Sequence, residues 1–238
     1  MQLAARLRPE DAEALSQRML EAIDDVSANR WEAAKRRAEQ LPGTIRPEKI
    51  DALARSFSRE LGTAGAAAGA VAITPVIGTG ASLLTAVAEL GWFTARAGDL
   101  VLTIAAVHGR TDPTVEERRA WVLAVLIYGS SAKEGFSKAV GEASRSTATG
   151  VNQRLPFATL QVANRLMSRS MLQRYGTRRG LIALGRALPV GIGALIGGGA
   201  NYRAIRKLAR DADAFFARLP YSAIDVDSTD VTGRELSD

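Results

Sequence analysis

Helical periodicity extends over almost the whole chain, and it constrains the fold more than any other feature. Apolar residues recur at spacings of three and four, as in Leu15, Met19, Ile23 and Val26. No segment of useful length shows the alternation typical of a half-buried strand. The sequence therefore predicts an all-α fold, a multi-helix bundle. The expected helices cover about residues 9–40, 47–61, 81–108, 114–129, 132–146, 157–174 and 200–218.

Proline and glycine divide the 238 residues into parts. Leu41-Pro42-Gly43 ends the first helical segment, and Leu219-Pro220 ends the last. We expect a helical N-terminal extension at 1–45, a helical core at 46–220 and an acidic, disordered tail at 221–238. Thr114 and Glu117 have the spacing of a capping box, which predicts a helix start at this point.

Two uncharged, glycine-rich runs occupy residues 61–88 and 187–202. The first is long enough to span a bilayer, but Pro75 divides it into halves that are each too short. Gly65/Gly69 and Gly193/Gly197 have the spacing that lets helix backbones approach closely. We favour buried, tightly crossing helices, and the alternative is a hairpin that inserts into lipid. The runs also align with each other from Pro75 and Pro189 onward, which indicates either a pseudo-repeat of two helical hairpins or two corners of similar composition.

The net charge of +6 is unevenly distributed. Residues 1–129 carry 15 bases and 16 acids, residues 130–220 carry 15 bases and 4 acids, and residues 221–238 carry 1 base and 5 acids. Between Glu142 and Asp211 there are twelve bases and no acid. Such a block attracts polyanions or an anionic membrane unless the first half of the chain neutralises it within the fold.

Composition excludes several kinds of chemistry. The chain has no cysteine and one histidine, His108, so it predicts neither thiolate catalysis nor a metal site made of cysteines or of two histidines. Gly191, Gly193 and Gly197 follow a proline in a helical context, which argues against a nucleotide-binding turn, since that turn needs a preceding strand. We therefore expect no metal, no cofactor and no catalytic residues. The first twenty residues carry early charge and show no secretory signal, which favours a cytoplasmic location.

The helix expected at 81–108 carries a narrow polar stripe on an otherwise apolar surface. The stripe contains Glu89, Trp92, Arg96 and Asp99, and Arg96 and Asp99 are spaced to pair with each other. A solvated edge or a structural ion pair would explain it. If the protein binds a small polar group, these four residues are the first candidates.

The helix expected at 200–218 is amphipathic. One face is apolar and the opposite face carries Arg203, Arg206, Lys207 and Arg210. A solvated surface would explain the cations, but they are also the best candidates for contact with phosphates or lipid headgroups. Arg178 and Arg179 belong to the same basic block and join them as candidates.

Two motifs resemble the EcsC protein family. Asp99-Leu through Ala105-Ala-Val-His-Gly109, followed by Asp112-Pro113, is similar to the middle of that family, and Leu188-Pro189 leading to Asn201-Tyr202 is similar to its C-terminal signature. The resemblance covers about residues 50–218. It implies an all-α bacterial protein that acts at or near the membrane, in a family named from a gene beside a transporter pair linked to secretion. It supplies no catalytic residues. The excess of arginine over lysine is typical of high-GC, actinobacterial genomes.

Two functions from different classes follow. The first is a non-enzymatic helical protein that associates peripherally with an anionic membrane surface, or with a membrane-bound partner, on the inner face of the cell membrane. The alternative is a binding protein or enzyme for a small-molecule or lipid-like ligand, built on a buried polar stripe of helix 81–108. Nucleic-acid binding ranks third, because the basic block has few aromatic residues for stacking and no known motif.

Overall fold

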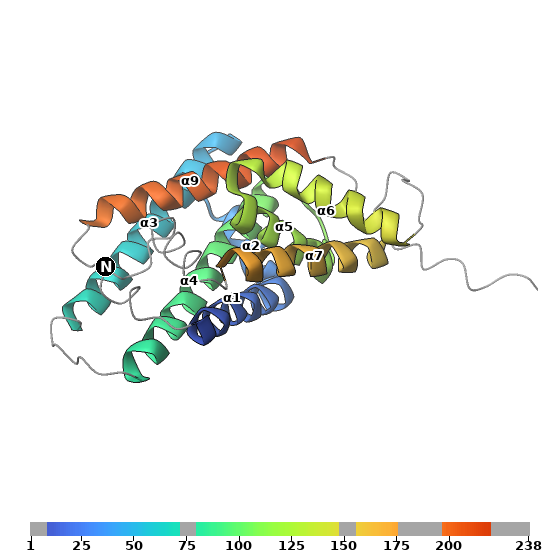
Figure 1. Cartoon of the computed structure of the whole chain (residues 1–238). Helices are drawn as coiled ribbons and strands as arrows, with labels where there is room; N and C mark the ends of the chain where they lie inside the picture. Colours follow the sequence, from blue (N-terminus) through green and yellow to red (C-terminus); the bar gives the residue numbers. More distant parts are fainter. Residues whose placement is uncertain (1–8, 72–79, 148–155, 176–196, 220–238) are drawn as a thin grey trace, which may run out of the picture.

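A computed structural model describes residues 9–71, 80–147, 156–175 and 197–219. This part of the chain is all-α and contains no strand. The helices are α1 (Pro9–Asn29), α2 (Trp31–Glu39), α3 (Arg46–Val71), α4 (Gly80–Val107), α5 (Val115–Tyr128), a 3₁₀ turn η1 (Gly129–Ser131), α6 (Ala132–Thr147), α7 (Phe157–Tyr175) and α9 (Gly197–Arg218). In Figure 1, α9 lies along one side of the bundle and α1 and α7 along the other, with α4 and α5 between them.

The central helix is α4, which packs against α1, α2, α3, α5 and α9. Leu100, Val101 and Ile104 are fully buried because helices surround this part of α4. The stretch Leu90–Val107 is the one segment of the described residues that is long and apolar enough to cross a membrane, with a mean hydropathy of 1.3. It is 67% buried inside the bundle, as expected of a core helix.

The first predicted helix is in fact two. The helix is interrupted at Arg30, so that α1 and α2 replace the single helix expected over residues 9–40. The break lets the two helices pack differently. Helix α1 packs on α4, α5 and α7, whereas α2 packs mainly on α4. Trp31, Ala34 and Ala38 are buried in α2, and the predicted apolar stripe of α1 is buried as well. Both helices of the expected N-terminal extension thus contribute to the common core.

The predicted capping box at the start of α5 is confirmed. The Thr114 hydroxyl accepts a hydrogen bond from the Glu117 backbone N–H at 3.2 Å, and the Glu117 carboxylate accepts one from the Thr114 N–H at 2.8 Å. These two bonds satisfy donors that a helix start otherwise leaves free.

Both uncharged runs contribute helix ends to the same end of the bundle. Residues 61–71 complete α3, residues 80–88 begin α4, and α9 begins at Gly197. Figure 1 shows these three helix ends on the same side of the molecule. The corners at Pro75 and Pro189, on which the pseudo-repeat depends, lie outside the described residues, as does the acidic tail.

Candidate interface for an anionic surface

The amphipathic pattern of α9 places its apolar face in the core. Ile205, Ala209, Ala212, Phe215 and Phe216 are at most 2% exposed. The two phenylalanine rings meet edge to face at 5.0 Å, and they anchor α9 against α5 and α6 through contacts with the rings of Trp121 and Phe136. This burial fixes the rotation of the helix, so that the opposite, basic face points outward.

The four predicted cations of α9 have different surroundings. Arg206 forms an ion pair with Asp51 of α3, and Lys207 lies 2.5 Å from Asp211 one turn further along α9. Arg203 and Arg210 are exposed, and neither has a carboxylate partner among the described residues. The two arginines are therefore free to meet an external anion.

Helix α3 extends this basic face, which the sequence did not predict. Asp51 pairs with Arg206, while Arg46 near the start of α3 lies 3.8 Å from Asp213 near the end of α9. The two helices are therefore antiparallel. One turn beyond Asp51, Arg55 lies at the level of Arg203, and it pairs with Asp51 from the other side.

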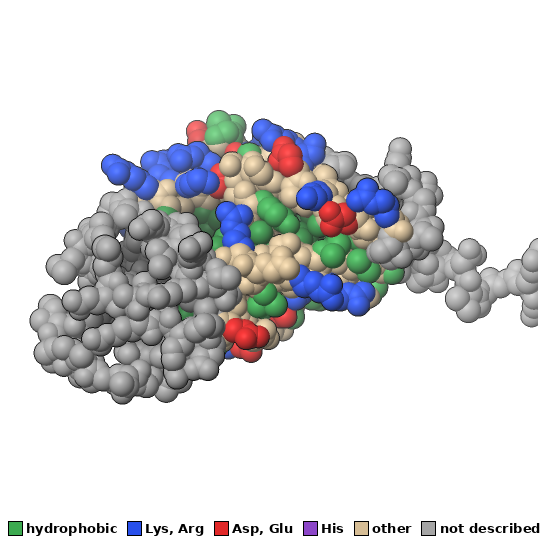
Figure 2. Space-filling view, viewed as in Figure 1, with side chains coloured by type: hydrophobic (Ala, Val, Ile, Leu, Met, Phe, Trp, Pro, Cys, Tyr) green, Lys and Arg blue, Asp and Glu red, His purple; other side chains and the backbone are tan. Residues whose placement is uncertain are grey.

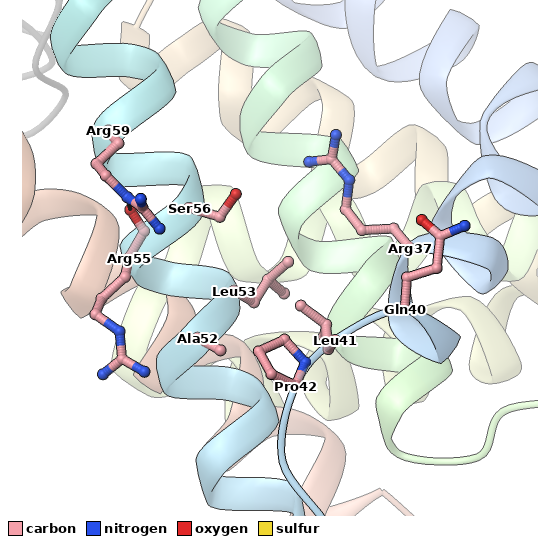
Figure 3. Close-up of a pocket in the computed structure, with 9 residues that line it drawn as sticks. All are labelled: Arg37, Gln40, Leu41, Pro42, Ala52, Leu53, Arg55, Ser56 and Arg59. Atoms are coloured by element: carbon pink, nitrogen blue, oxygen red, sulfur yellow. Dashed lines mark hydrogen bonds between the residues drawn. The ribbon is translucent and has the colours of Figure 1, made fainter.

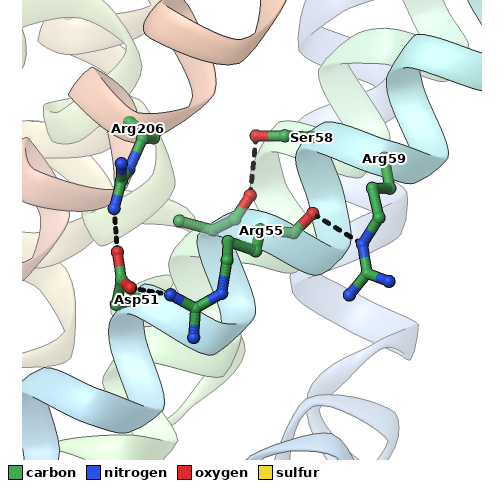
Figure 4. Close-up of polar contacts among 6 residues, drawn as sticks. Asp51, Arg55, Ser58, Arg59 and Arg206 are labelled. Carbon is green, nitrogen blue, oxygen red and sulfur yellow. Dashed lines mark hydrogen bonds and ion pairs between the residues drawn. The ribbon is translucent and has the colours of Figure 1, made fainter.

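Arg59 follows one further turn along α3, and its Nε donates to the Arg55 backbone carbonyl at 3.5 Å. Figure 4 shows Asp51 between Arg206 and Arg55, with Arg59 next along the same helix. We call this region the α3–α9 basic surface; its six cations are Arg55, Arg59, Arg203, Arg206, Lys207 and Arg210. Asp51 and Asp211 are the carboxylates paired within it. In Figure 2, Lys and Arg side chains gather along the edge occupied by α9.

An open pocket adjoins the α3–α9 basic surface on the side that faces α2. Its volume is about 410 Å³, and α2, the segment after it and α3 form its walls. The lining residues are Arg37, Gln40, Leu41, Pro42, Ala52, Leu53, Arg55, Ser56 and Arg59. Figure 3 places Arg37 on one side and the two α3 arginines on the other, with Leu41, Pro42 and Leu53 between them. Thus the pocket combines cations with an apolar floor.

The polar stripe of α4 is divided among different environments. Arg96 bonds both Asp99 and Glu60 of α3, and its side chain is 14% exposed. Burial raises the pKa of the Asp99 carboxyl, and attraction to Arg96 opposes this shift. Trp92 is 44% exposed. The side chain of Glu89 lies outside the described part.

An aromatic ring links the stripe to the pocket wall. The guanidinium groups of Arg96 and Arg37 lie 4.9 Å and 4.7 Å from the centre of the Phe57 ring, which is buried. Arg96 therefore ties α3 to α4. Arg37 lines the pocket between α2 and α3, and Arg96 does not.

The remaining candidates are two arginines of the basic block. Arg178 and Arg179 lie outside the described residues. Within the described part of the chain, no group of three or more acidic or histidine side chains is placed to hold a metal ion.

Comparison with known protein families gives a match over most of the chain. The model of the EcsC protein family matches residues 8–219, which include α1 and α2 as well as the two motifs noted in the sequence. No curated protein and no solved structure matches the chain.

Proposed function

This chain belongs to the EcsC protein family, and from that premise we propose that it is a non-enzymatic helical protein that binds peripherally to an anionic membrane surface. The binding face is the α3–α9 basic surface, and the location is the cytoplasmic face of the cell membrane. The observation that carries the proposal is the side-by-side arrangement of α3 and α9, in which the Asp51–Arg206 ion pair joins residues 155 positions apart in the sequence and brings the cations of the two helices onto one face.

The charge on this face is of the right size for reversible binding. A basic residue close to an anionic leaflet contributes about 1 kcal/mol. Arg59, Arg203 and Arg210 have no carboxylate partner within the described residues, and Arg55 and Arg206 share the single carboxylate of Asp51, which leaves one further positive charge. A sum of a few kcal/mol corresponds to weak binding that salt weakens further, since the Debye length is about 8 Å at physiological ionic strength.

Vesicle flotation tests the proposal directly. The protein should float with vesicles that contain an anionic lipid, remain behind with neutral vesicles, and dissociate at high salt. Reversal of two charges, in Arg203→Glu with Arg210→Glu, should abolish flotation. The matched control is Arg165→Glu with Arg169→Glu, which makes the same change in net charge at two exposed positions of α7, away from α9 in Figure 1.

Three outcomes would overturn the proposal. The first is equal partitioning to neutral and anionic vesicles. The second is an equal loss of flotation in the α7 control, which would indicate an effect of net charge alone. The third is binding only to native membranes that still carry their proteins, which would indicate a protein partner. Release by detergent but not by salt would instead support the inserted hairpin.

A further inference from the structure

We propose that the pocket between α2 and α3 binds a phosphate monoester with an apolar substituent, through Arg37 and Arg59. This inference deepens the proposed membrane association by naming the headgroup that the protein prefers. That the ligand comes from a lipid rests on the proposed function. Arg37 lies outside the α3–α9 basic surface, so the two proposals can be tested separately.

The first argument is the availability of the guanidinium groups. Arg55 also lines the pocket, but it is held by Asp51. Arg37 and Arg59 form no ion pair within the described part of the chain, and Arg37 Nη1 is buried without a hydrogen-bond partner there. The covered Nη1 does not itself reach a ligand in the pocket, so the ligand meets the remaining nitrogens of the Arg37 guanidinium, whose charge no ion pair neutralises there.

The second argument is that Arg37 is held in place before any ligand binds. Its guanidinium stacks over the buried Phe57 ring at 4.7 Å, on a helix that is itself fixed by the burial of Trp31, Ala34 and Ala38. Arg59 makes one long, exposed hydrogen bond, 3.5 Å from its Nε to the Arg55 carbonyl oxygen. This bond leaves both terminal nitrogens of Arg59 able to donate. Two guanidinium groups on opposite walls match the several acceptor oxygens of a phosphate.

The third argument is the composition of the walls. None of the nine lining residues is acidic, and the Asp99 carboxylate, which also attracts Arg37, is paired with Arg96. Gln40 and Ser56 supply neutral donors, while Leu41, Pro42 and Leu53 form an apolar floor. A volume of about 410 Å³ lies within the range of small-molecule sites and leaves room beside the phosphate for an organic substituent. A dianionic monoester suits the two free arginines better than a zwitterionic headgroup does.

Binding is measured first with a ligand that is free in solution, which separates the pocket from the membrane. Dihexanoyl phosphatidic acid, below its micelle concentration, should bind in calorimetry, whereas dihexanoyl phosphatidylcholine should not. Inorganic phosphate should compete only weakly because it leaves the apolar floor empty. If inorganic phosphate binds as well as the ester, or if neither ester binds, the pocket assignment is wrong.

The second measurement uses vesicles of phosphatidylcholine that contain either phosphatidic acid or phosphatidylglycerol at matched surface charge. We expect about tenfold tighter binding to the phosphatidic acid vesicles, as one charge-assisted contact would give. Arg37→Met keeps a long side chain over Phe57 but removes the charge, and it should erase this preference while leaving phosphatidylglycerol binding unchanged. Arg37→Lys should restore the preference in part.

The matched control is Arg36→Met, at the adjacent exposed position of α2 that does not line the pocket. It should keep the preference for phosphatidic acid. Equal binding to both vesicles by the unmodified protein, or an equal effect of the Arg36 and Arg37 variants, would overturn the pocket assignment. Binding of the soluble ester without binding to either vesicle would uphold the pocket and overturn the membrane proposal.

Discussion

At the scale of single residues, Arg96 decides between a structural tie and a ligand site on α4. The side chain bonds carboxylates of α3 and α4, so its removal leaves Glu60 and the mostly buried Asp99 without their common partner. We expect Arg96→Ala to lower the free energy of unfolding by about 2–3 kcal/mol. Urea denaturation measures the change. Arg59→Ala, at an exposed position one residue before Glu60, should stay within about 0.5 kcal/mol of the unmodified protein.

If Arg96→Ala were instead as stable as the Arg59→Ala control, the tie between α3 and α4 would be refuted and a binding role for the stripe would regain support. The pairing of Arg96 with Asp99 was predictable, because residues three apart on a helix are neighbours. The bond to Glu60 was not, because it depends on how α3 packs against α4.

His108 gives a residue-scale prediction about pH. The side chain is buried at the end of α4, and its Nε2 lies 2.8 Å from Asp213 Oδ1 on α9. Burial lowers the pKa of His108, the contact with Asp213 opposes this shift, and the positive charges of Arg46 and Arg110 add to the lowering. Below the ordinary value of about 6.5 the unfolded chain therefore binds more protons at this site than the folded protein does.

The contribution of His108 to stability is accordingly present above about pH 6.5 and is lost as the pH falls toward the lower folded pKa. Urea denaturation between about pH 7 and 5.5 should show a decrease in the free energy of unfolding for the unmodified protein. The decrease should be smaller in His108→Gln, which cannot titrate. Parallel pH profiles for the two proteins would contradict the assignment.

At the scale of helices, the crossing of α1 over α4 depends on a glycine. A Cβ atom added to Gly98 would lie 2.9 Å from Val26 Cγ1, which is closer than carbon atoms pack. Gly98→Ala should therefore destabilise the protein by about 1–3 kcal/mol, although alanine is the better helix former. Thermal and urea denaturation measure the effect.

The matched control is Gly141→Ala in α6, where an added Cβ atom meets nothing within 4 Å. Here only helix propensity changes, and we expect the free energy of unfolding to increase by about 0.5–1 kcal/mol. An increase in the free energy of unfolding at both positions would show that α1 and α4 can move apart without loss of stability. Helix positions and the Thr114 cap were predictable because they depend on local periodicity and spacing. The crossing at Gly98 was not, because no local pattern tells which helix packs on which.

At the scale of the whole molecule, the fold combines halves of the chain that have very different charge. The outward basic face of α9 was predictable from its own amphipathic pattern. The contribution of Arg55 and Arg59 was not, since residues 1–129 are nearly neutral as a whole and only the antiparallel packing of α3 on α9 places these arginines on the same face as the cations of α9. Their spacing of four on α3 was the one local signal for a basic stripe.

The orientation of the molecule on a membrane follows from this arrangement and can be read from tryptophan fluorescence. Trp92 is 44% exposed, whereas Trp31 and Trp121 are 4% and 6% exposed, so Trp92 alone should respond strongly to a change of solvent. It lies one turn from Arg96, toward the end of the bundle where α4 begins and α3 ends. A membrane that contacts the α3–α9 basic surface and the adjoining pocket would come close to this end.

We therefore expect anionic vesicles to shift the tryptophan emission of the protein to shorter wavelength and to reduce the quenching of this emission by acrylamide. The reason is that indole rings favour the headgroup region. High salt should reverse both effects, and Trp92→Phe should abolish them without changing flotation. A protein that floats with anionic vesicles while Trp92 remains fully quenched would lie on α9 alone, with the pocket directed away from the lipid. That result would leave the basic surface in place and remove the membrane as the source of the pocket's ligand.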